Sequence, residues 1–324
     1  MTNRHIPDSA DRRHFPQILR WLSFSAAVLV AAQAGYGQEQ SSDPAGGQSE
    51  ATSGNPEASV LLRQSRDNLS GYRTLKAKMV ETAEFGPRRF KAEGVYLQGV
   101  DHRVRVDVDV SIGENKGRLL QVSDGEVLWT IYDVGPKLRI TRRDVNQILA
   151  ATDGAQAKAT ELAELGLGGL PALLASIERS NDFQPTQTAT IEGRKFYVLQ
   201  GVWKPEVRQQ FQAKAQLLPA PTTEPRPLPP HVPDLIRVYL DSETLFPYRI
   251  RYLKQIEAAP GAEPAPILTL DFRDIVVNAS LDPSEFRYTP PAEAEVADIT
   301  SFYLQKIKDT AGNAPASSTG NAPQ

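Results

Sequence analysis

The chain of 324 residues contains no cysteine. This absence excludes disulfide bonds, and it also excludes the lipidated cysteine that follows the signal of a membrane-anchored bacterial lipoprotein. The stability of the folded protein must therefore come from the burial of apolar side chains.

Histidine is scarce as well, with four residues in the chain, of which only His102 and His231 lie beyond the N-terminal region. A zinc site without cysteine and with two distant histidines lacks its usual ligands. The glycine-rich phosphate loops and the Gly-x-Ser-x-Gly nucleophile motif are also missing. Asp107 and Asp109 share a strand face with arginines that neutralise them, which favours a solvated surface over a carboxylate pair. We therefore predict no catalytic residue, no metal site and no cofactor; a hydrolase that uses Asp or Glu is the least favoured hypothesis.

The N-terminal region has the pattern of an export signal. Arginines precede an apolar run, Trp21 to Ala32, whose length is typical of a signal peptide rather than of a membrane span. Small residues follow, as a cleavage site requires. Residues 1–37 are therefore predicted to be a cleaved export signal that directs the protein to the periplasm. The alternative is an inner-membrane anchor formed by residues 21–34.

Composition divides the rest of the chain. Residues 38–57 and 310–324 have few large apolar side chains, which predicts a disordered linker and a disordered tail. Residues 58–309 have a suitable length for one large, open β domain. Within them, residues 217–233 are rich in proline and are predicted to form a surface insert with polyproline character. The formal net charge of −3 argues against a nucleic-acid surface.

The hydrophobic pattern predicts an α+β fold. Val104, Val106, Val108 and Val110 alternate with charged residues, as in a half-buried antiparallel strand. Helical spacing occurs after residue 59 and again in the middle of the chain, whereas the remaining segments are strand-like. Runs of strands with segregated helices indicate an antiparallel sheet covered by a few helices.

The central helix follows a glycine-rich segment. Its apolar residues are spaced at i, i+3, i+4 and i+7, and they are Leu170, Leu173, Leu174 and Ile177. Gly166, Gly168 and Gly169 precede them, and such a glycine-rich segment is what the hinge of a movable lid requires. Periodicity alone is equally compatible with an ordinary core helix, and it favours that alternative.

A hairpin is predicted around Asp124-Gly125, between the apolar runs of Leu119 to Tyr132. In the second run Leu128 and Tyr132 share one face, and Trp129 lies on the other. One of these faces is expected to line the concave side of the sheet, and the register needed to decide which cannot be read from one sequence.

Two motifs carry a resemblance to a known family. The first is Val122-Ser-Asp-Gly125 followed by Leu128-Trp129 and Tyr132, and the second comprises Asn278, Leu281, Phe286, Tyr288, Pro290 and Pro291. Together they resemble the superfamily of periplasmic outer-membrane lipoprotein carriers, the LolA-like and LppX-like proteins. The resemblance implies a curled antiparallel β-sheet, a half-open barrel, whose apolar cavity receives the lipid part of a lipoprotein.

The same resemblance implies a non-enzymatic carrier that shields a lipid or a lipoprotein acyl chain from water. Transient contact with a membrane surface is expected of such a carrier. The alternative is a structural or interaction module of the cell envelope, which docks a protein partner through the proline-rich loop. The lipid-binding candidates are Val104, Val106, Leu128, Trp129, Tyr132, Leu170, Leu173, Leu174 and Ile177, and the hinge candidates are Gly166, Gly168 and Gly169.

Overall fold

The computed structural model describes residues 56–85, 88–134, 137–152, 154, 162, 165–214, 227–255 and 263–312. The predicted export signal, the linker up to residue 55, residues 217–226 of the proline-rich insert and residues 313–324 of the tail lie outside the described residues. No helix in the described ranges is long and apolar enough to cross a bilayer.

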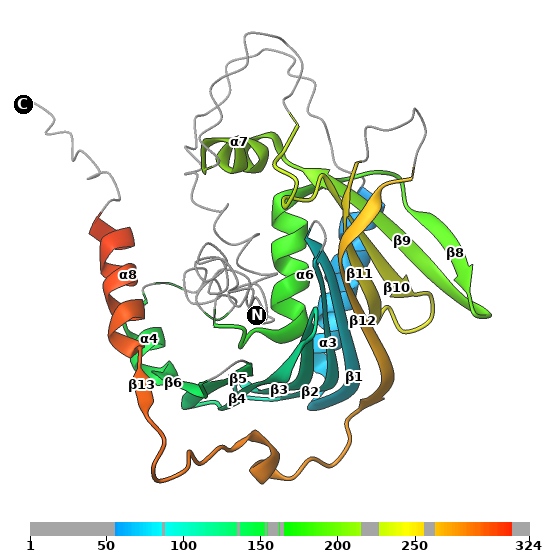
Figure 1. Cartoon of the computed structure of the whole chain (residues 1–324). Coiled ribbons are helices and arrows are strands. Elements are labelled where there is room, and N and C mark those ends of the chain that lie inside the picture. Colours follow the sequence, from blue (N-terminus) through cyan, green and yellow to red (C-terminus); the bar gives the residue numbers. More distant parts are fainter. Residues whose placement is uncertain are drawn as a thin grey trace, which may run out of the picture.

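Thirteen strands form one curled, open sheet, in the order β13-β6-β5-β4-β3-β2-β1-β12-β11-β10-β9-β7 with β8 also paired to β9 (Figure 1). Neighbouring strands are antiparallel except for β13 and β6. The strands are β1 Thr74–Phe85, β2 Arg88–Gly99, β3 Arg103–Ile112, β4 Asn115–Asp124, β5 Val127–Val134, β6 Arg139–Asp144, β7 Asn181–Phe183, β8 Gln187–Ile191, β9 Arg194–Trp203, β10 Leu235–Asp241, β11 Pro247–Lys254, β12 Ala265–Val277 and β13 Val296–Asp298. The predicted α+β fold with a half-open, curled sheet is confirmed.

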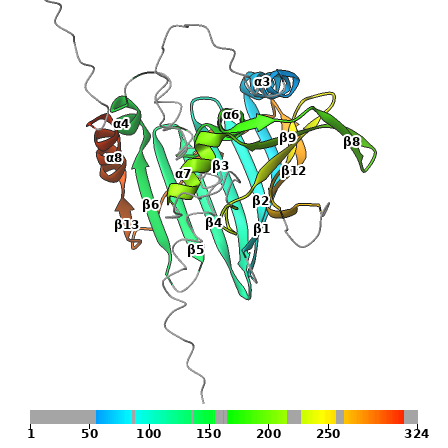
Figure 2. The same cartoon turned by 90° about the horizontal axis from the view of Figure 1, so that it is seen from above.

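The helices are segregated from the sheet. They are α3 Pro56–Gly71, α4 Val145–Ala150, α6 Gly169–Ser180, α7 Pro205–Lys214 and α8 Thr300–Gly312, with a 3-10 helix, η2, at Pro283–Phe286. Figure 1 shows α6 inside the curl of the sheet, and Figure 2 shows α4 and α8 beside β6 and β13 at one edge. An ion pair between Arg66 Nη1 and Glu178 Oε2, at 3.0 Å, joins α3 to α6.

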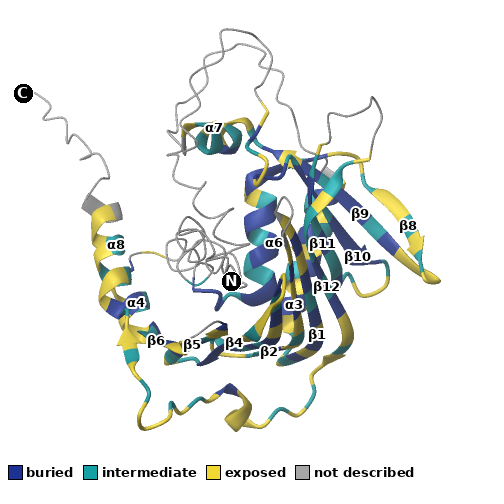
Figure 3. Cartoon of the chain, in the orientation of Figure 1, coloured by how far each residue is buried: buried dark blue, intermediate teal, exposed yellow. Residues whose placement is uncertain are grey.

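Strand β3 shows how the sequence gives the curled sheet one apolar face and one charged face. The predicted alternation is confirmed, because Val104, Val106, Val108 and Val110 are buried while the charged residues between them are partly or fully exposed. Successive side chains of a strand point to opposite faces, so the valines lie on one face and the charges on the other. Figure 3 shows the buried residues gathered on α6 and the strands around it.

Close strand contact at a glycine contributes to the curl. A Cβ atom added to Gly94 of β2 would lie 2.0 Å from the backbone oxygen of Asp107 on β3. Only glycine permits so close an approach, and a glycine within a strand commonly marks such a bend.

The C-terminal segment crosses the convex side of the sheet. The Phe286-to-Tyr288 part of the second sequence motif has the alternation of a strand, but the chain forms η2 here and then runs on without pairing until β13. The Asp282 side chain accepts a hydrogen bond from the Ser284 amide at 2.8 Å and caps the short helix. Pro290 and Pro291 follow, and proline has no amide hydrogen for a strand ladder.

Ionic contacts hold this segment against β3 and β4. Arg105 and Arg118 both donate to the Asp107 carboxylate, with Arg105 Nη2 and Arg118 Nε each 2.7 Å from it. Arg105 Nη1 also donates to the Glu285 backbone oxygen at 3.0 Å. Partial burial raises the pKa of Asp107, but the bonds from both arginines outweigh it, so the net pKa is lowered.

We expect Asp107→Asn to destabilise the fold by roughly 2 kcal/mol, because it weakens three charge-assisted hydrogen bonds and the hold of Arg105 on η2. Urea unfolding at neutral pH measures the change. Asp109→Asn is the matched control, since Asp109 lies on the same face of the same strand but is exposed. Equal losses in the two variants would contradict a specific role for Asp107.

Candidate functional site

The concave face of the sheet is the face against which α6 packs. The Tyr96 hydroxyl donates to Gln98 Oε1 at 2.6 Å and bonds to the backbone of Leu170 at the start of α6. Further along the sheet, Gln121 Nε2 donates to the Leu165 backbone oxygen at 3.0 Å. The residues that share this face follow from the strand register, in which Tyr96 is opposite Ala77 on β1 and Val106 on β3.

This face is apolar along most of the sheet. Its buried residues belong to one core cluster together with α6. On the strands they include Leu75, Ala77, Met79, Ala83, Phe90, Ala92, Tyr96, Val104, Val106, Val108, Val110, Leu119, Leu128, Leu199, Ile236, Val238, Leu240, Ile250, Tyr252, Leu270 and Phe272.

The structure brings together all the predicted lipid-binding residues except Trp129. Val104, Val106 and Leu128 lie on the concave face, and Tyr132 is half-buried beside them with the Arg139 guanidinium 5.3 Å from its ring centre. The four apolar residues of α6, which are Leu170, Leu173, Leu174 and Ile177, are at most 1% exposed. Helix α6 thus covers the concave face with its apolar stripe turned inward.

Trp129 lies on the convex face. Its ring is 5.7 Å from that of Tyr288, centre to centre, and it packs on a separate apolar cluster. That cluster is formed by Leu120, Val122, Ile131 and Ile140. The two sequence motifs therefore meet in space, but on the side of the sheet opposite α6.

The glycines before α6 place it close to the sheet. Gly166 and Gly169 have positive φ angles of 74° and 56°, whereas Gly168 has a helical φ of −76°. A Cβ atom on Gly169 would lie 2.4 Å from Gln98 Oε1 and 2.7 Å from the Tyr96 hydroxyl. Gly169 is therefore required for the close contact between the start of α6 and the Tyr96 and Gln98 side chains. The hinge role of the three glycines stays a prediction.

Sequence reasoning missed two polar side chains on the concave face. Glu81 on β1 is 6% exposed and Tyr252 on β11 is 4% exposed. Burial raises the pKa of Glu81 to about 8 and also raises the pKa of Tyr252. The signal was present in β1, where Glu81 takes a position in the alternation whose other members, such as Met79 and Ala83, are apolar.

The described end of the proline-rich insert is anchored to the sheet. Lys254 Nζ on β11 donates to the backbone oxygens of Leu228 at 2.8 Å and Val232 at 3.0 Å. Trp203 Nε1 on β9 donates to the Pro233 oxygen at 2.6 Å. Residues 227–233 are thus held against the sheet, whereas residues 217–226, through which a protein partner was predicted to dock, lie outside the described residues.

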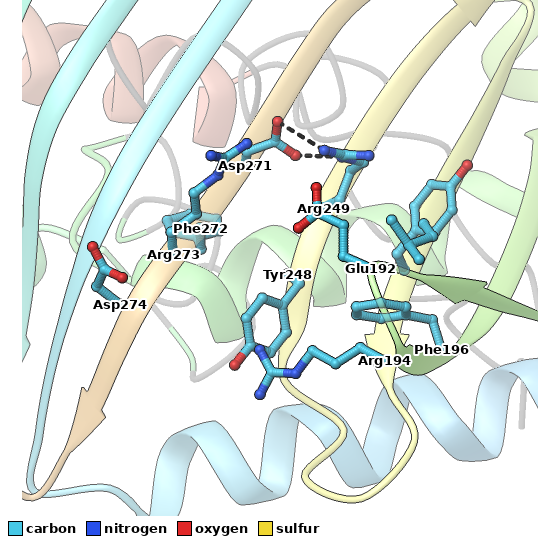
Figure 4. A pocket seen from close by; sticks show the side chains of 11 residues that line it. Glu192, Arg194, Phe196, Tyr248, Arg249, Asp271, Phe272, Arg273 and Asp274 are labelled. Carbon is cyan, nitrogen blue, oxygen red and sulfur yellow. Dashed lines mark hydrogen bonds and ion pairs between the residues drawn. The ribbon is translucent and has the colours of Figure 1, made fainter.

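A pocket of about 260 Å³ opens on the convex side of β9 to β12 (Figure 4). The Arg194 guanidinium lies 4.4 Å from the ring centre of Tyr248, and Arg249 is paired with Asp271. The pocket is smaller than the usual sites for drug-sized ligands, and charged groups line much of it. It does not suit an acyl chain.

No protein-family model matches the chain, and no curated protein matches it. Among solved structures, it is similar to the lipoprotein LppX of Mycobacterium tuberculosis, with 10% identity, a TM-score of 0.36 and coverage of 70% of this chain and 98% of LppX. It is also similar to a LolA superfamily protein of Nitrosomonas europaea, with 12% identity, a TM-score of 0.25 and coverage of 71% and 97%. For the MucA/MucB complex of Pseudomonas aeruginosa the identity is 14%, the TM-score 0.32 and the coverage 72% and 61%.

These structures include a protein of the superfamily that the sequence motifs resemble. Among the described residues, no group of three or more His, Asp or Glu side chains could hold a metal ion.

Proposed function

We propose that this protein is a non-enzymatic carrier that binds a lipid or the acyl chain of a lipoprotein against the concave face of its half-open sheet. The observation that carries the proposal is the separation of chemistry between the two faces. On β3 the concave side presents valines, whereas the convex side presents Arg105, Asp107 and Asp109. Each methylene that leaves water gains roughly 0.8 kcal/mol, so an apolar face of this extent suits an acyl chain.

The proposed site uses the residues that the fold brings together. Val104, Val106, Leu128 and Tyr132 supply the sheet side, and the apolar stripe of α6 supplies the cover. Trp129 is left out, because it packs on Tyr288 at the convex face. In this proposal α6 moves away from the sheet to admit the acyl chain, with Gly166, Gly168 and Gly169 as the hinge.

The carrier acts in the periplasm, after cleavage of residues 1–37. The export-like N-terminal sequence supports this location. A carrier of acyl chains must collect and deliver them at membrane surfaces, so brief contact with a bilayer belongs to the proposal.

Photo-cross-linking tests the site directly. The purified protein is incubated with a fatty acid that carries a photoreactive group on its chain, irradiated and analysed by peptide mass spectrometry. We expect labels on Leu128, Tyr132 and the α6 stripe. Trp129 is the internal control, because it is next to Leu128 in sequence but points to the other face.

Labelling of Trp129 and Tyr288 with none on Leu128 or α6 would place the acyl chain on the wrong side of the sheet and contradict the proposal. Extraction of the purified protein with organic solvent is the independent measurement. A protein that yields no lipid and binds no acyl probe is not a carrier.

A further inference from the structure

Two polar groups lie among apolar residues of the concave face, on strands β1 and β11, which flank β12. Glu81 is on β1 and is paired across the sheet with Ala92 on β2 and Leu270 on β12. Tyr252 is on β11 and is paired with Leu268, which is itself opposite Ala83. Glu81 and Tyr252 therefore share one face, separated by strand β12.

Among the described residues, neither group has a polar partner. The buried Tyr252 hydroxyl makes no hydrogen bond to any of them. Within the part of the chain that the structure describes, no hydrogen bond or ion pair is recorded for the Glu81 carboxyl, and burial is the cause of its raised pKa. The two groups are close enough that the charge of Glu81 raises the pKa of Tyr252.

Such an arrangement requires an explanation. Buried polar groups in proteins are nearly always hydrogen-bonded, and an unpaired one destabilises the folded state. Two unpaired groups on either side of β12, among the apolar side chains of Ala83, Leu268 and Leu270, are suited to a polar atom of a bound ligand.

We propose that Glu81 and Tyr252 hold the carbonyl oxygen of the bound acyl group, as found in a fatty acid or a fatty-acid ester. This inference rests on the proposed function and names the polar end of its cargo. The Tyr252 hydroxyl donates one hydrogen bond to the carbonyl oxygen, and the protonated Glu81 carboxyl donates the other. The hydrocarbon chain then lies along the apolar face.

The protonation state follows from the surroundings of Glu81. A carboxyl with a pKa of about 8 is mostly neutral at neutral pH and can donate a hydrogen bond. No cation is paired with it among the described residues, and its cross-strand neighbours, Ala92 and Leu270, are apolar. The one charge effect that involves Glu81 is the one it exerts on Tyr252, which lies across β12 on the same face.

Competition with a fluorescent acyl probe tests the proposal, using methyl palmitate, palmitic acid, hexadecane and hexadecylamine as competitors. The ester is expected to bind several-fold more tightly than the alkane. Tyr252→Phe and Glu81→Leu should each lower the affinity for the ester by roughly three- to ten-fold, which corresponds to the loss of one hydrogen bond. Both variants should leave the affinity for hexadecane unchanged. The relative affinities of palmitic acid and its ester distinguish a free acid from an esterified cargo.

Two variants on the convex face serve as controls. Tyr239→Phe removes a hydroxyl from β10, the strand beside β11, and Glu84→Gln alters an exposed carboxylate on β1, the strand of Glu81. Both should bind the ester like the wild type. Circular dichroism establishes that all four variants fold, and Tyr252→Phe removes an unpaired hydroxyl without adding volume.

The outcomes separate this inference from the proposed function. Equal binding of hexadecane and the ester would contradict the carbonyl site, and so would ester binding that neither concave-face variant changes. In both cases the proposed carrier function would still stand. Tighter binding of hexadecylamine than of the ester would show that Glu81 is ionised and binds a cationic head group, which also overturns the inference. If no competitor displaces the probe, the proposed function itself fails.

Discussion

Gly169→Ala is expected to lower the unfolding free energy by about 3 kcal/mol or more, which is roughly 10 °C in melting temperature for a domain of this size. The new methyl group would meet Gln98 Oε1 and the Tyr96 hydroxyl at 2.4 and 2.7 Å. Both side chains would have to move, which breaks their mutual hydrogen bond and the bond to α6 in a buried site. The positive φ of 56° adds strain for any residue with a Cβ atom.

Gly113→Ala is the matched control. Gly113 has nearly the same φ, 58°, but no atom lies within 4 Å of the added Cβ. Its substitution should cost only the backbone strain, about 1–2 kcal/mol. Equal destabilisation of the two variants would mean that α6 does not depend on its contact with Tyr96 and Gln98. Under the proposed function, Gly169→Ala should also release a bound acyl probe faster, whereas Gly113→Ala should not.

A second large effect is expected from pH. The pKa of Glu81 lies near 8 in the folded protein, against an ordinary value of 4.5. Between these values the folded state binds a proton that the unfolded state has released, so the contribution of Glu81 to stability is complete below about pH 4.5 and is lost as the pH rises through 8. A difference of this size corresponds to a loss of the order of 5 kcal/mol.

Urea unfolding at several pH values between about 5 and 9 measures this loss. The difference in unfolding free energy between the wild type and Glu81→Gln isolates the contribution of Glu81, because the other titrating groups are common to both proteins. The difference should change steadily with pH in favour of the variant. The same comparison with Glu84→Gln, an exposed position on the same strand, should show no such trend. If the difference between the wild type and Glu81→Gln does not depend on pH, the Glu81 carboxyl is either exposed or paired with another group, and the prediction is wrong.

The sequence pattern predicted the sheet well where one face is buried and the other is charged. The alternation of valines and charges in β3 is the direct result of that environment, and it fixed the faces of the strand in advance. The pattern was less informative for the hairpin of Leu128 and Trp129, because both of its faces are apolar. Leu128 faces the core beneath α6, whereas Trp129 is covered by the C-terminal segment, and only the tertiary structure distinguishes the two.

Two further differences between the sequence-based expectations and the structure also arise from tertiary surroundings. The Phe286 and Tyr288 motif has strand-like alternation, but the capped turn at Asp282 and the prolines that follow prevent pairing with the sheet. The burial of Glu81 was not predicted, since charged residues are usually exposed. Its position in an otherwise apolar alternation on β1 was the only sequence signal of its burial.

The position of β1 in the sheet has a consequence for the order of folding. Strands β1 to β6 pair with their neighbours in sequence, and so do β9 to β12, but β1 joins β12 across the middle of the sheet. At that junction the Thr74 hydroxyl donates to the Ala279 backbone oxygen, 205 residues further along the chain. Contacts between residues so distant in sequence form slowly, because a long loop must close first. Until β12 has emerged, β1 presents an unpaired edge that can pair with another chain. The first half of this protein therefore needs protection from aggregation for as long as the second half is still being made.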